Sequence, residues 1–315
     1  MEFPSKLRKH VRPRADYIPE SFFTTDLENI LLLVRGKPEL EWDSLRIAIY
    51  IAHEFGNKIT LYHYGFESEQ KFSSYLQQLK ELKIHHELKI SHPTNKNPSR
   101  NDFLQNLIDI TNTGEYQLAI ATSTLDRRFW QSKNVSYEAL RKMPIPGIQV
   151  IPSLEDQKKK KLVFTSVGAL TPGSKRDPFL LQLGIAIVSS TRHSDLVAYH
   201  WTRVPNLLTP KVLSEAPGVQ KDVAIFLHNI GEAMRMGIPI EQRHVLGHDF
   251  VRSMDEVVKK DQLDLLIMGY GKPRLGKRLS IELAKRLTCT TVIFHGRPSF
   301  ERKKRFDRTK QTETT

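Results

Sequence analysis

Short apolar runs alternate with longer amphipathic stretches along this chain of 315 residues. Residues 30–34 read ILLLV and residues 264–269 read DLLIMG, and such runs are typical of strands that are buried on both faces of a sheet. Residues 100–112 instead repeat apolar positions every three or four residues, as one face of a helix does. Strands that alternate with helices predict an α/β protein with a parallel sheet covered on both faces.

The alternation occurs twice, with the elements in the same order. The first copy has predicted strands at residues 29–36, 58–65, 84–90, 116–122 and 147–152, and predicted helices at 44–56, 69–82, 100–112 and 136–142. The second copy has predicted strands at 161–168, 195–201, 238–247, 264–269 and 290–296, and predicted helices at 179–190, 219–237, 250–260 and 280–287. We therefore expect two tandem, doubly wound α/β domains, each an open parallel sheet.

Four consecutive lysines at positions 158–161 separate the two copies. Such a charged run is not expected to cross a hydrophobic core, so the domain boundary falls there. The predicted division is a basic N-terminal arm over residues 1–26, a first domain over 27–153, a lysine-rich linker over 154–161, a second domain over 162–297, and a basic, disordered tail over 298–315.

The net charge of +13 lies mostly outside the predicted domains. Residues 1–16 carry +3, residues 297–315 carry +4 and the four lysines carry +4, which together make +11. Charge runs of this kind attract phosphate or anionic lipid without specificity. We expect no specific nucleic-acid partner for the folded body, and sequence-indifferent binding of nucleic acid through the tails stays an alternative.

The chain is expected in the cytoplasm. Cys289 is the single cysteine, which excludes an internal disulfide and a cysteine-based zinc site and fits a reducing compartment. The longest aliphatic run, residues 30–34, is far shorter than the roughly 18 residues of a membrane span. The basic N-terminus lacks the apolar segment of a secretory signal. It would instead suit a position at the inner face of a membrane.

Three segments, at residues 134–152, 246–269 and 280–296, carry a family resemblance. They read NVSYEALRKMPIPGIQVIP, LGHDFVRSMDEVVKKDQLDLLIMG and SIELAKRLTCTTVIFHG. Together with the element order over residues 27–297, they are similar to the universal stress protein (UspA-like) family, specifically its tandem members. The resemblance implies adenine-nucleotide-alpha-hydrolase-like domains. It extends to the cytoplasmic domains of some prokaryotic transporters, among them cation–chloride cotransporters, amino-acid permeases and antiporters.

The resemblance also implies where a nucleotide would bind. In nucleotide-binding members of the family, an Asp-Gly pair after the first strand contacts the nucleoside, and a glycine-rich loop after the fourth strand holds the phosphates. The matching pair is Arg35–Gly36 in the first copy and Val167–Gly168 in the second. The acid is missing from both, so the hydrogen bonds that it would make to a ribose are missing too, and both nucleotide sites are expected to be degenerate.

The loop after the fourth strand of the second copy is the remaining candidate site. It keeps glycines and cations beside a helix start, where backbone amides and positive charge favour an anion. The candidate residues are Gly269, Gly271, Lys272, Gly276, Lys277, Arg278 and Ser280. ATP or another adenine nucleotide is the candidate ligand, and a solvated basic loop without a ligand is the alternative. The first copy has no glycine between Thr122 and Asn134 and carries Phe129 and Trp130 there.

Two other motifs are rejected as sites. GKPRLGK at residues 271–277 has the spacing of a P-loop, but Arg278 follows where Ser or Thr must hold magnesium. His244 and His248 lie four residues apart, yet the alternation places them on a strand and its exit loop, where they would not share a face. Asp249 is instead expected to cap the helix that follows. No metal site is predicted.

His63 and His200 end matching strands of the two copies. They either line the crevice at the strand ends, where α/β proteins bind ligands, or serve packing and capping. No nucleophile elbow, zinc-binding helix or dinucleotide fingerprint occurs in the sequence. No catalytic residue is therefore predicted.

The sequence favours a non-enzymatic, cytoplasmic regulatory or sensing module that acts on, or is attached to, a membrane transporter. The resemblance implies that the closing strands at residues 147–152 and 290–296 meet, which would make the two copies an intramolecular pseudo-dimer, and it allows a homodimer of whole chains. One alternative is a stress protein that binds an adenine nucleotide through the second-copy loop, with slow hydrolysis of ATP left open. The other is nonspecific binding of nucleic acid through the tails.

Overall fold

The structure, a computed structural model, describes residues 27–93, 99–123, 135–153, 163–171, 177–190, 195–203, 240–270 and 279–295. The predicted arm, the predicted linker, the tail and the predicted helix at 219–237 lie outside these ranges. The elements of the N-terminal half are β1 (Asn29–Leu33), α3 (Pro38–Phe55), β2 (Lys58–Tyr64), the 3-10 helix η1 (Glu69–Phe72), α4 (Ser73–Glu81), β3 (His86–Ser91), α5 (Arg100–Asn112), β4 (Leu118–Thr122), α6 (Val135–Lys142) and β5 (Gly147–Ile151). Those of the C-terminal half are β6 (Ser166–Leu170), α8 (Asp177–Ser189), β7 (Asp195–Arg203), β8 (Ile240–Gly247), α11 (Phe250–Lys260), β9 (Leu265–Gly269), α12 (Leu279–Ala284) and β10 (Thr290–His295).

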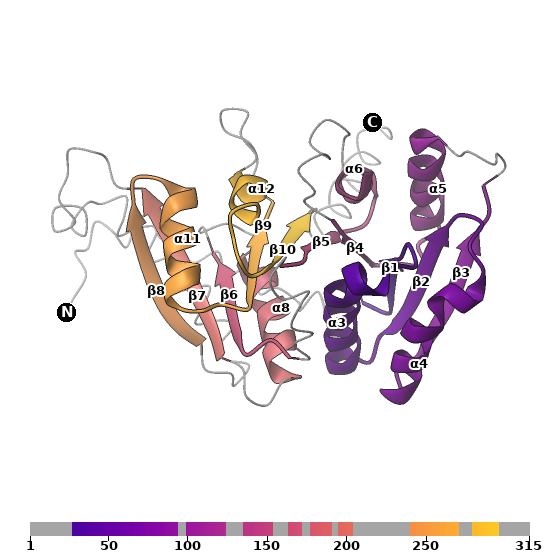
Figure 1. The fold of residues 1–315 in the computed structure, drawn as a ribbon, viewed down its shortest axis with the longest axis horizontal. Coiled ribbons are helices and arrows are strands. Elements are labelled where there is room, and N and C mark those ends of the chain that lie inside the picture. Colours follow the sequence, from indigo (N-terminus) through magenta and orange to yellow (C-terminus); the bar gives the residue numbers. More distant parts are fainter. Residues whose placement is uncertain are drawn as a thin grey trace, which may run out of the picture.

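The described strands form one sheet of ten strands, in the order β3-β2-β1-β4-β5-β10-β9-β6-β7-β8 (Figure 1). From either edge inward, each half presents its third, second, first, fourth and fifth strand. Neighbouring strands within a half are parallel throughout. The predicted duplication of a doubly wound parallel sheet is confirmed, and the two sheets are continuous with each other.

β5 and β10 join the two halves at the centre of the sheet. They run antiparallel, with Ile151 opposite Thr291 and Gly147 opposite His295. This pairing confirms the prediction that the two closing strands meet. Because main-chain hydrogen bonds cross the junction, the backbone itself holds the halves in register.

Helices cover both faces of the sheet. α3, α4 and α8 lie on one face, and α5, α6, α11 and α12 lie on the other (Figure 1). On the first face, one hydrophobic cluster extends from Leu79 in α4 to Val188 in α8 and includes Phe294 in the central strand β10. On the second face, one cluster packs α5 and α6 and a separate cluster packs α11 and α12. The two halves therefore share one continuous core on the first face, and on the second face the cluster beneath α11 and α12 includes Ile151 of β5.

α3 and α8, the first helices of the two halves, pack against each other across the centre. The buried Arg46 guanidinium lies 4.0 Å from the ring centroid of Phe164, and its Nη1 lies 3.2 Å from Asp43 Oδ1. Asp43 Oδ2 also accepts a hydrogen bond of 2.7 Å from Thr290 Oγ1. A buried cation that both stacks on a ring and pairs with a carboxylate fixes the geometry of the contact. These contacts connect the first half to the segments before β6 and at the start of β10.

β6 lies further along the chain than the predicted strand at residues 161–168. It begins only at Ser166, because Asp264 Oδ2 accepts hydrogen bonds from Thr165 N at 2.9 Å and from Thr165 Oγ1 at 2.5 Å just before the strand. Val167 and Gly168 therefore lie inside the strand, which continues to Leu170. The assignment of Val167–Gly168 to the pair after the first strand is wrong, since a glycine within a buried strand was taken for the end of the strand.

α3 begins at Pro38, earlier than the predicted start at residue 44. Proline suits the first turn of a helix because its fixed φ is helical and its missing N–H would have no partner there. Glu39 and Glu41 in that turn also favour the positive end of the helix dipole. At the other end, the predicted stop at Gly56 is confirmed, with a left-handed φ of 72° and its N–H bonded to Ala52 O.

The described helices are the covering layers of a sheet. Within the described ranges, no helix combines the length and the apolar character that crossing a bilayer requires. The lone Cys289 is buried in the cluster beneath α11 and α12.

Candidate functional site

A cavity of about 170 Å³ lies at the carboxyl ends of β1, β2 and β4. It is lined by Leu33, Val34, Arg35, Tyr62, His63, Tyr64, Phe103 and Thr122. The strand order reverses here, because β1 and β4 are neighbours in the sheet while the helices that follow them lie on opposite faces. Open α/β sheets bind their ligands at such a switch point. This cavity is the best-placed candidate site in the first half.

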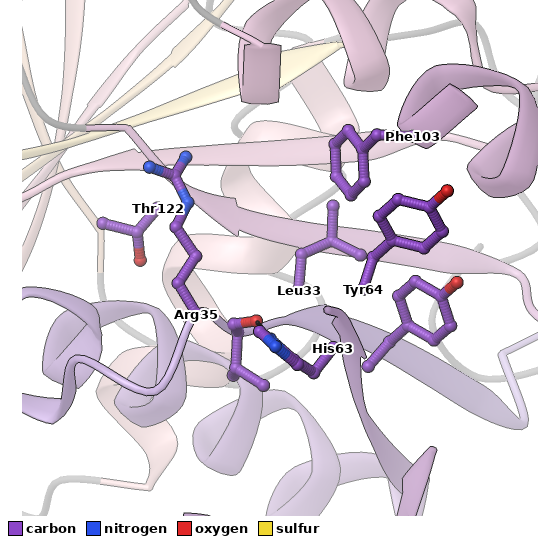
Figure 2. A pocket seen from close by; sticks show the side chains of 8 residues that line it. Leu33, Arg35, His63, Tyr64, Phe103 and Thr122 are labelled. Carbon is purple, nitrogen blue, oxygen red and sulfur yellow. Dashed lines mark hydrogen bonds between the residues drawn. The ribbon is translucent and has the colours of Figure 1, made fainter. Parts of the chain in front are cut away.

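The lining side chains divide into two groups (Figure 2). Figure 2 shows Arg35 and Thr122 on one side and Phe103 and Tyr64 on the other, with Leu33 between them. One end of the cavity is therefore polar and cationic, and the other is aromatic.

The buried carboxylate of Glu41 holds the turn between β1 and α3. Its Oε1 accepts a hydrogen bond of 2.8 Å from Arg35 N, and its Oε2 accepts bonds from Tyr75 OH at 2.6 Å and from Lys37 N at 3.4 Å. Burial raises the pKa of Glu41, although the bonds from Tyr75 and the two amides partly oppose that shift. Burial and the contact with Glu41 also raise the pKa of the Tyr75 hydroxyl. The Glu41 side chain thus fixes the backbone of the turn that carries Arg35.

Gly36, in the same turn, is required for a local structural reason. Its φ is +72°, a conformation that residues with side chains rarely adopt. A Cβ at this position would also lie 2.9 Å from Cγ and Cδ of Lys71, whose Nζ pairs with Glu67 Oε1 at 2.6 Å. The glycine of the pair Arg35–Gly36 is therefore explained by packing without any ligand.

His63 closes the cavity next to β1. Its Nδ1 lies 2.9 Å from Val34 O, and its ring centroid lies 5.0 Å from that of Phe72. A Cβ on Gly65 would come within 2.6 Å of His63 Nε2, so the ring needs glycine at that position. The His63 side chain lines the cavity and also links β2 to the end of β1. It therefore has both of the roles that the sequence offered as alternatives, lining the crevice and packing.

Thr122 ends β4 on the polar side of the cavity. It is 7% exposed, and its Oγ1 shares a short hydrogen bond with Ser44 Oγ, in which either hydroxyl can donate. Ser44 belongs to α3, so this bond ties the end of β4 to the helix that follows β1. The hydroxyl keeps a free lone pair for a second partner.

The aromatic side of the cavity joins β2 to α5. The ring centroids of Tyr64 and Phe103 lie 5.6 Å apart at an angle of 51°. Tyr62 OH donates to Asn106 Oδ1, and burial raises the pKa of Tyr62. α5 begins with a capping box in which Ser99 Oγ accepts from an amide of the first turn, so the helix that carries Phe103 is well anchored.

The second half repeats two of these features. His200 Nδ1 lies 2.8 Å from Thr171 O, as His63 Nδ1 does from Val34 O. Trp201 of β7 and Phe250, the first residue of α11, form an aromatic pair with centroids 5.3 Å apart. The duplication thus extends from the backbone to the side chains around the crevice.

His244 and His248 lie on a strand and its exit loop, as the sequence predicted. His244 lies in β8, and its Nε2 is 2.9 Å from Thr202 Oγ1, while His248 follows the strand. Asp249 caps α11, with Oδ1 accepting from Arg252 N at 2.8 Å. Within the described ranges, no group of three or more His, Cys, Asp or Glu side chains is placed to hold a metal ion.

The predicted phosphate loop lies largely outside the described residues. This applies to Gly271, Lys272, Gly276, Lys277 and Arg278, and also to Phe129 and Trp130 of the first copy. Gly269 is the last residue of β9, and Ser280, which is 7% exposed, lies in the first turn of α12. The loop therefore leaves the carboxyl end of a strand and enters a helix, as predicted, and its role in binding stays a prediction.

Sequence reasoning missed most of the first-half cavity. Among its lining residues, only Arg35 and His63 were considered for the crevice from the sequence. The available signal was positional, because Tyr64 and Thr122 are the last residues of two parallel strands and Phe103 lies in the first turns of a helix. The supporting carboxylate of Glu41 lies before residue 44, where the sequence predicts the helix to start, whereas the structure starts α3 at Pro38.

No protein-family model matches the chain, and no curated protein matches its sequence significantly. Solved structures do match. The cytoplasmic domain of a prokaryotic cation chloride cotransporter superposes with a TM-score of 0.55 at 12% identity, over 85% of this chain and 95% of that one. A universal stress protein from Archaeoglobus fulgidus has a TM-score of 0.54 at 13% identity, over 86% and 96%. A functionally unknown protein from Pseudomonas aeruginosa has a TM-score of 0.53 at 10% identity, over 85% and 92%.

At these identities the likeness concerns the fold. It covers nearly the whole of each matched chain, so it includes both halves and their junction. The chain has the universal stress protein fold, present twice in one continuous sheet.

Proposed function

We propose that the chain is a non-catalytic regulatory module, which binds a small ligand at the carboxyl ends of its strands and acts on a membrane transporter. The transporter is proposed because the cytoplasmic domain of a cation chloride cotransporter shares the fold over 85% of this chain. The continuous sheet supports a module that responds as one body, since the backbone pairing of β5 with β10 connects the two halves.

One observation carries the non-catalytic part of the proposal. Two cavity groups that could perform acid–base or nucleophilic chemistry, His63 and Thr122, are each bonded to a structural partner. His63 Nδ1 is bonded to Val34 O, and Thr122 Oγ1 is bonded to Ser44 Oγ. Nucleophilic catalysis needs a hydroxyl within hydrogen-bond reach of a base. This arrangement favours binding without turnover.

The proposal is tested by solute uptake in cells of the source organism. Deleting the gene is expected to change the uptake rate of one ion or amino acid at unchanged abundance of its transporter, and restoring the gene is expected to reverse the change. The purified chain is expected to hydrolyse neither ATP nor simple esters above the background rate. Unchanged uptake of every solute tested, or clear turnover by the purified chain, would contradict the proposal.

A second candidate function is adenine-nucleotide binding by the loop between β9 and α12. The described ends of this loop support it, because Gly269 closes a buried strand and α12 begins at Leu279. The residues proposed for the phosphates are Gly271, Lys272, Gly276, Lys277 and Arg278, in addition to Gly269 and Ser280.

A thermal-shift panel of ATP, AMP and cyclic dinucleotides tests this second function. A nucleotide at a hundredfold excess over its dissociation constant should stabilise the chain by about 2.7 kcal/mol. For a chain of this size, that is expected to raise the melting temperature by about 5 °C. Lys277→Ala should abolish the shift, whereas Lys260→Ala, an exposed lysine on α11, should preserve it. The absence of any shift in the wild-type chain would exclude the loop as a nucleotide site.

A further inference from the structure

The first-half cavity is small. Its volume is about 170 Å³, whereas pockets that hold drug-sized ligands measure roughly 300–1,000 Å³. A cavity of about 150 Å³ with apolar walls holds a single benzene ring. The cavity therefore has room for one ring with a small substituent, and a whole nucleotide does not fit inside it.

The aromatic end of the cavity suits a flat ring. Phe103 and Tyr64 meet at 51° with centroids 5.6 Å apart, and Leu33 lies beside them (Figure 2). A planar ligand ring can pack edge-to-face or offset against such a pair. Leu33, which is 9% exposed, adds an apolar surface to this end of the cavity.

The polar end suits an anion. Arg35 is solvent-exposed, and its planar guanidinium matches both oxygens of a carboxylate. Thr122 lies on the same side of the cavity, and its hydroxyl is shared only with Ser44 among the described residues. The Arg35 side chain also starts from a rigid backbone, because Glu41 accepts a hydrogen bond from its amide at 2.8 Å. A fixed starting point reduces the entropy lost when the side chain is ordered by a ligand.

We propose that this cavity binds a small carboxylate that carries one aromatic ring. The ring packs against Leu33, Tyr64 and Phe103, and the carboxylate bonds to Arg35 and Thr122. Only the role of the ligand as a signal rests on the proposed regulatory function. Binding itself is measured on the purified chain, so its failure is distinct from a failure of the uptake experiment.

The second half does not repeat the polar end. The sheet register and the two matching histidine contacts equate position 172, a proline, with Arg35. The same register equates Gly269 with Thr122. Neither residue offers a side-chain donor. We therefore expect one ligand per chain, bound in the first half.

The test is calorimetric titration of the full chain with benzoate and with benzamide, its neutral isostere. Benzoate is expected to bind with a stoichiometry of one and a dissociation constant on the order of 1 mM or tighter, as its few atoms allow. Benzamide is expected to bind at least about tenfold more weakly, because it cannot form the charge-assisted pair. Because both ligands are compared on the unaltered chain, this result does not depend on any variant folding.

Two pairs of variants locate the site. Arg35→Gln should weaken benzoate binding about tenfold or more, whereas Arg252→Gln, at a side chain that is 80% exposed on α11, should leave it within about twofold. Phe103→Ala should also weaken binding, and Phe250→Ala, its counterpart in the second half, should not. Equal binding of benzoate and benzamide, binding unaffected by Arg35→Gln, or no saturable binding of benzoate up to about 10 mM would each overturn the inference.

Discussion

Replacing Glu41 by alanine is expected to lower the free energy of unfolding by about 3 kcal/mol. The carboxylate accepts hydrogen bonds from Arg35 N, Lys37 N and Tyr75 OH, and alanine leaves all three donors without an acceptor. A buried donor without a partner costs about 1–3 kcal/mol, and the two amides, which are only partly buried, recover some of that from water. Urea denaturation at pH 7 measures the effect.

Glu39→Ala is the matched control for this prediction. Glu39 lies in the same first turn of α3 but is exposed, and its replacement should change the unfolding free energy by less than about 0.5 kcal/mol. Glu41→Gln should cost less than Glu41→Ala, since its amide oxygen still accepts from part of the turn. If Glu41→Ala were as stable as Glu39→Ala, the carboxylate would not be what holds the turn.

The same carboxyl predicts a pH dependence of stability. Burial raises the pKa of Glu41 above its ordinary value of 4.5, so the folded chain holds this proton more tightly than the unfolded chain does. The resulting stabilisation is fully present below pH 4.5 and is lost as the pH rises through the raised folded-state value. The stability of the wild-type chain relative to Glu41→Gln should therefore fall as the pH rises above 4.5. A constant difference over that range would contradict the shift.

Replacing Phe294 by alanine is expected to destabilise both halves together by about 3–5 kcal/mol, the usual cost of removing a buried phenylalanine. Phe294 is 1% exposed, lies opposite Ile148 across the central strand pair and stacks on Phe179 of α8 at 6.2 Å. Its cluster includes residues of both halves, so the resulting void weakens a shared core. The two halves should therefore continue to unfold in one transition.

Tryptophan fluorescence measures this cooperativity. In a Trp130→Phe background, Trp42 in α3 reports on the first half and Trp201 in β7 reports on the second. Phe294→Ala should lower both denaturation midpoints by the same amount. Leu82→Ala, at a side chain that is 52% exposed, should move neither midpoint by a measurable amount. A shift seen by only one tryptophan would mean that the halves unfold independently.

Much of the fold could be predicted because its signals are local. The apolar runs at β1 and β9 identify strands buried on both faces, Gly56 marks the end of α3, and Asp249 marks the start of α11. The prediction of the bounds of β6 failed because the local sequence is compatible with two positions for the end of this strand. Gly168 could end a strand or lie inside one, and the choice depended on the bonds of Asp264 to the segment before β6.

The candidate site was less predictable than the fold. Its lining residues come from β1, β2, β4 and α5, and no spacing along the chain signals that these elements converge. The spacing of glycines and lysines instead predicts a phosphate site in the loop after β9, because these residue types directly indicate close backbone approach and positive charge. The aromatic end of the cavity has no such signal in the sequence, because Tyr64 and Phe103 become neighbours only when β2 and α5 pack together.

The sequence by itself determined the duplicated α/β order and the parallel halves. These follow from hydrophobic period and from residue identity, which are properties of the chain alone. Only the tertiary structure decided that one face of the sheet carries a core common to both halves, and that a small cavity with one cationic and one aromatic end lies at the switch point. Burial and cavity volume depend on how distant segments meet in space, and that meeting is set by packing.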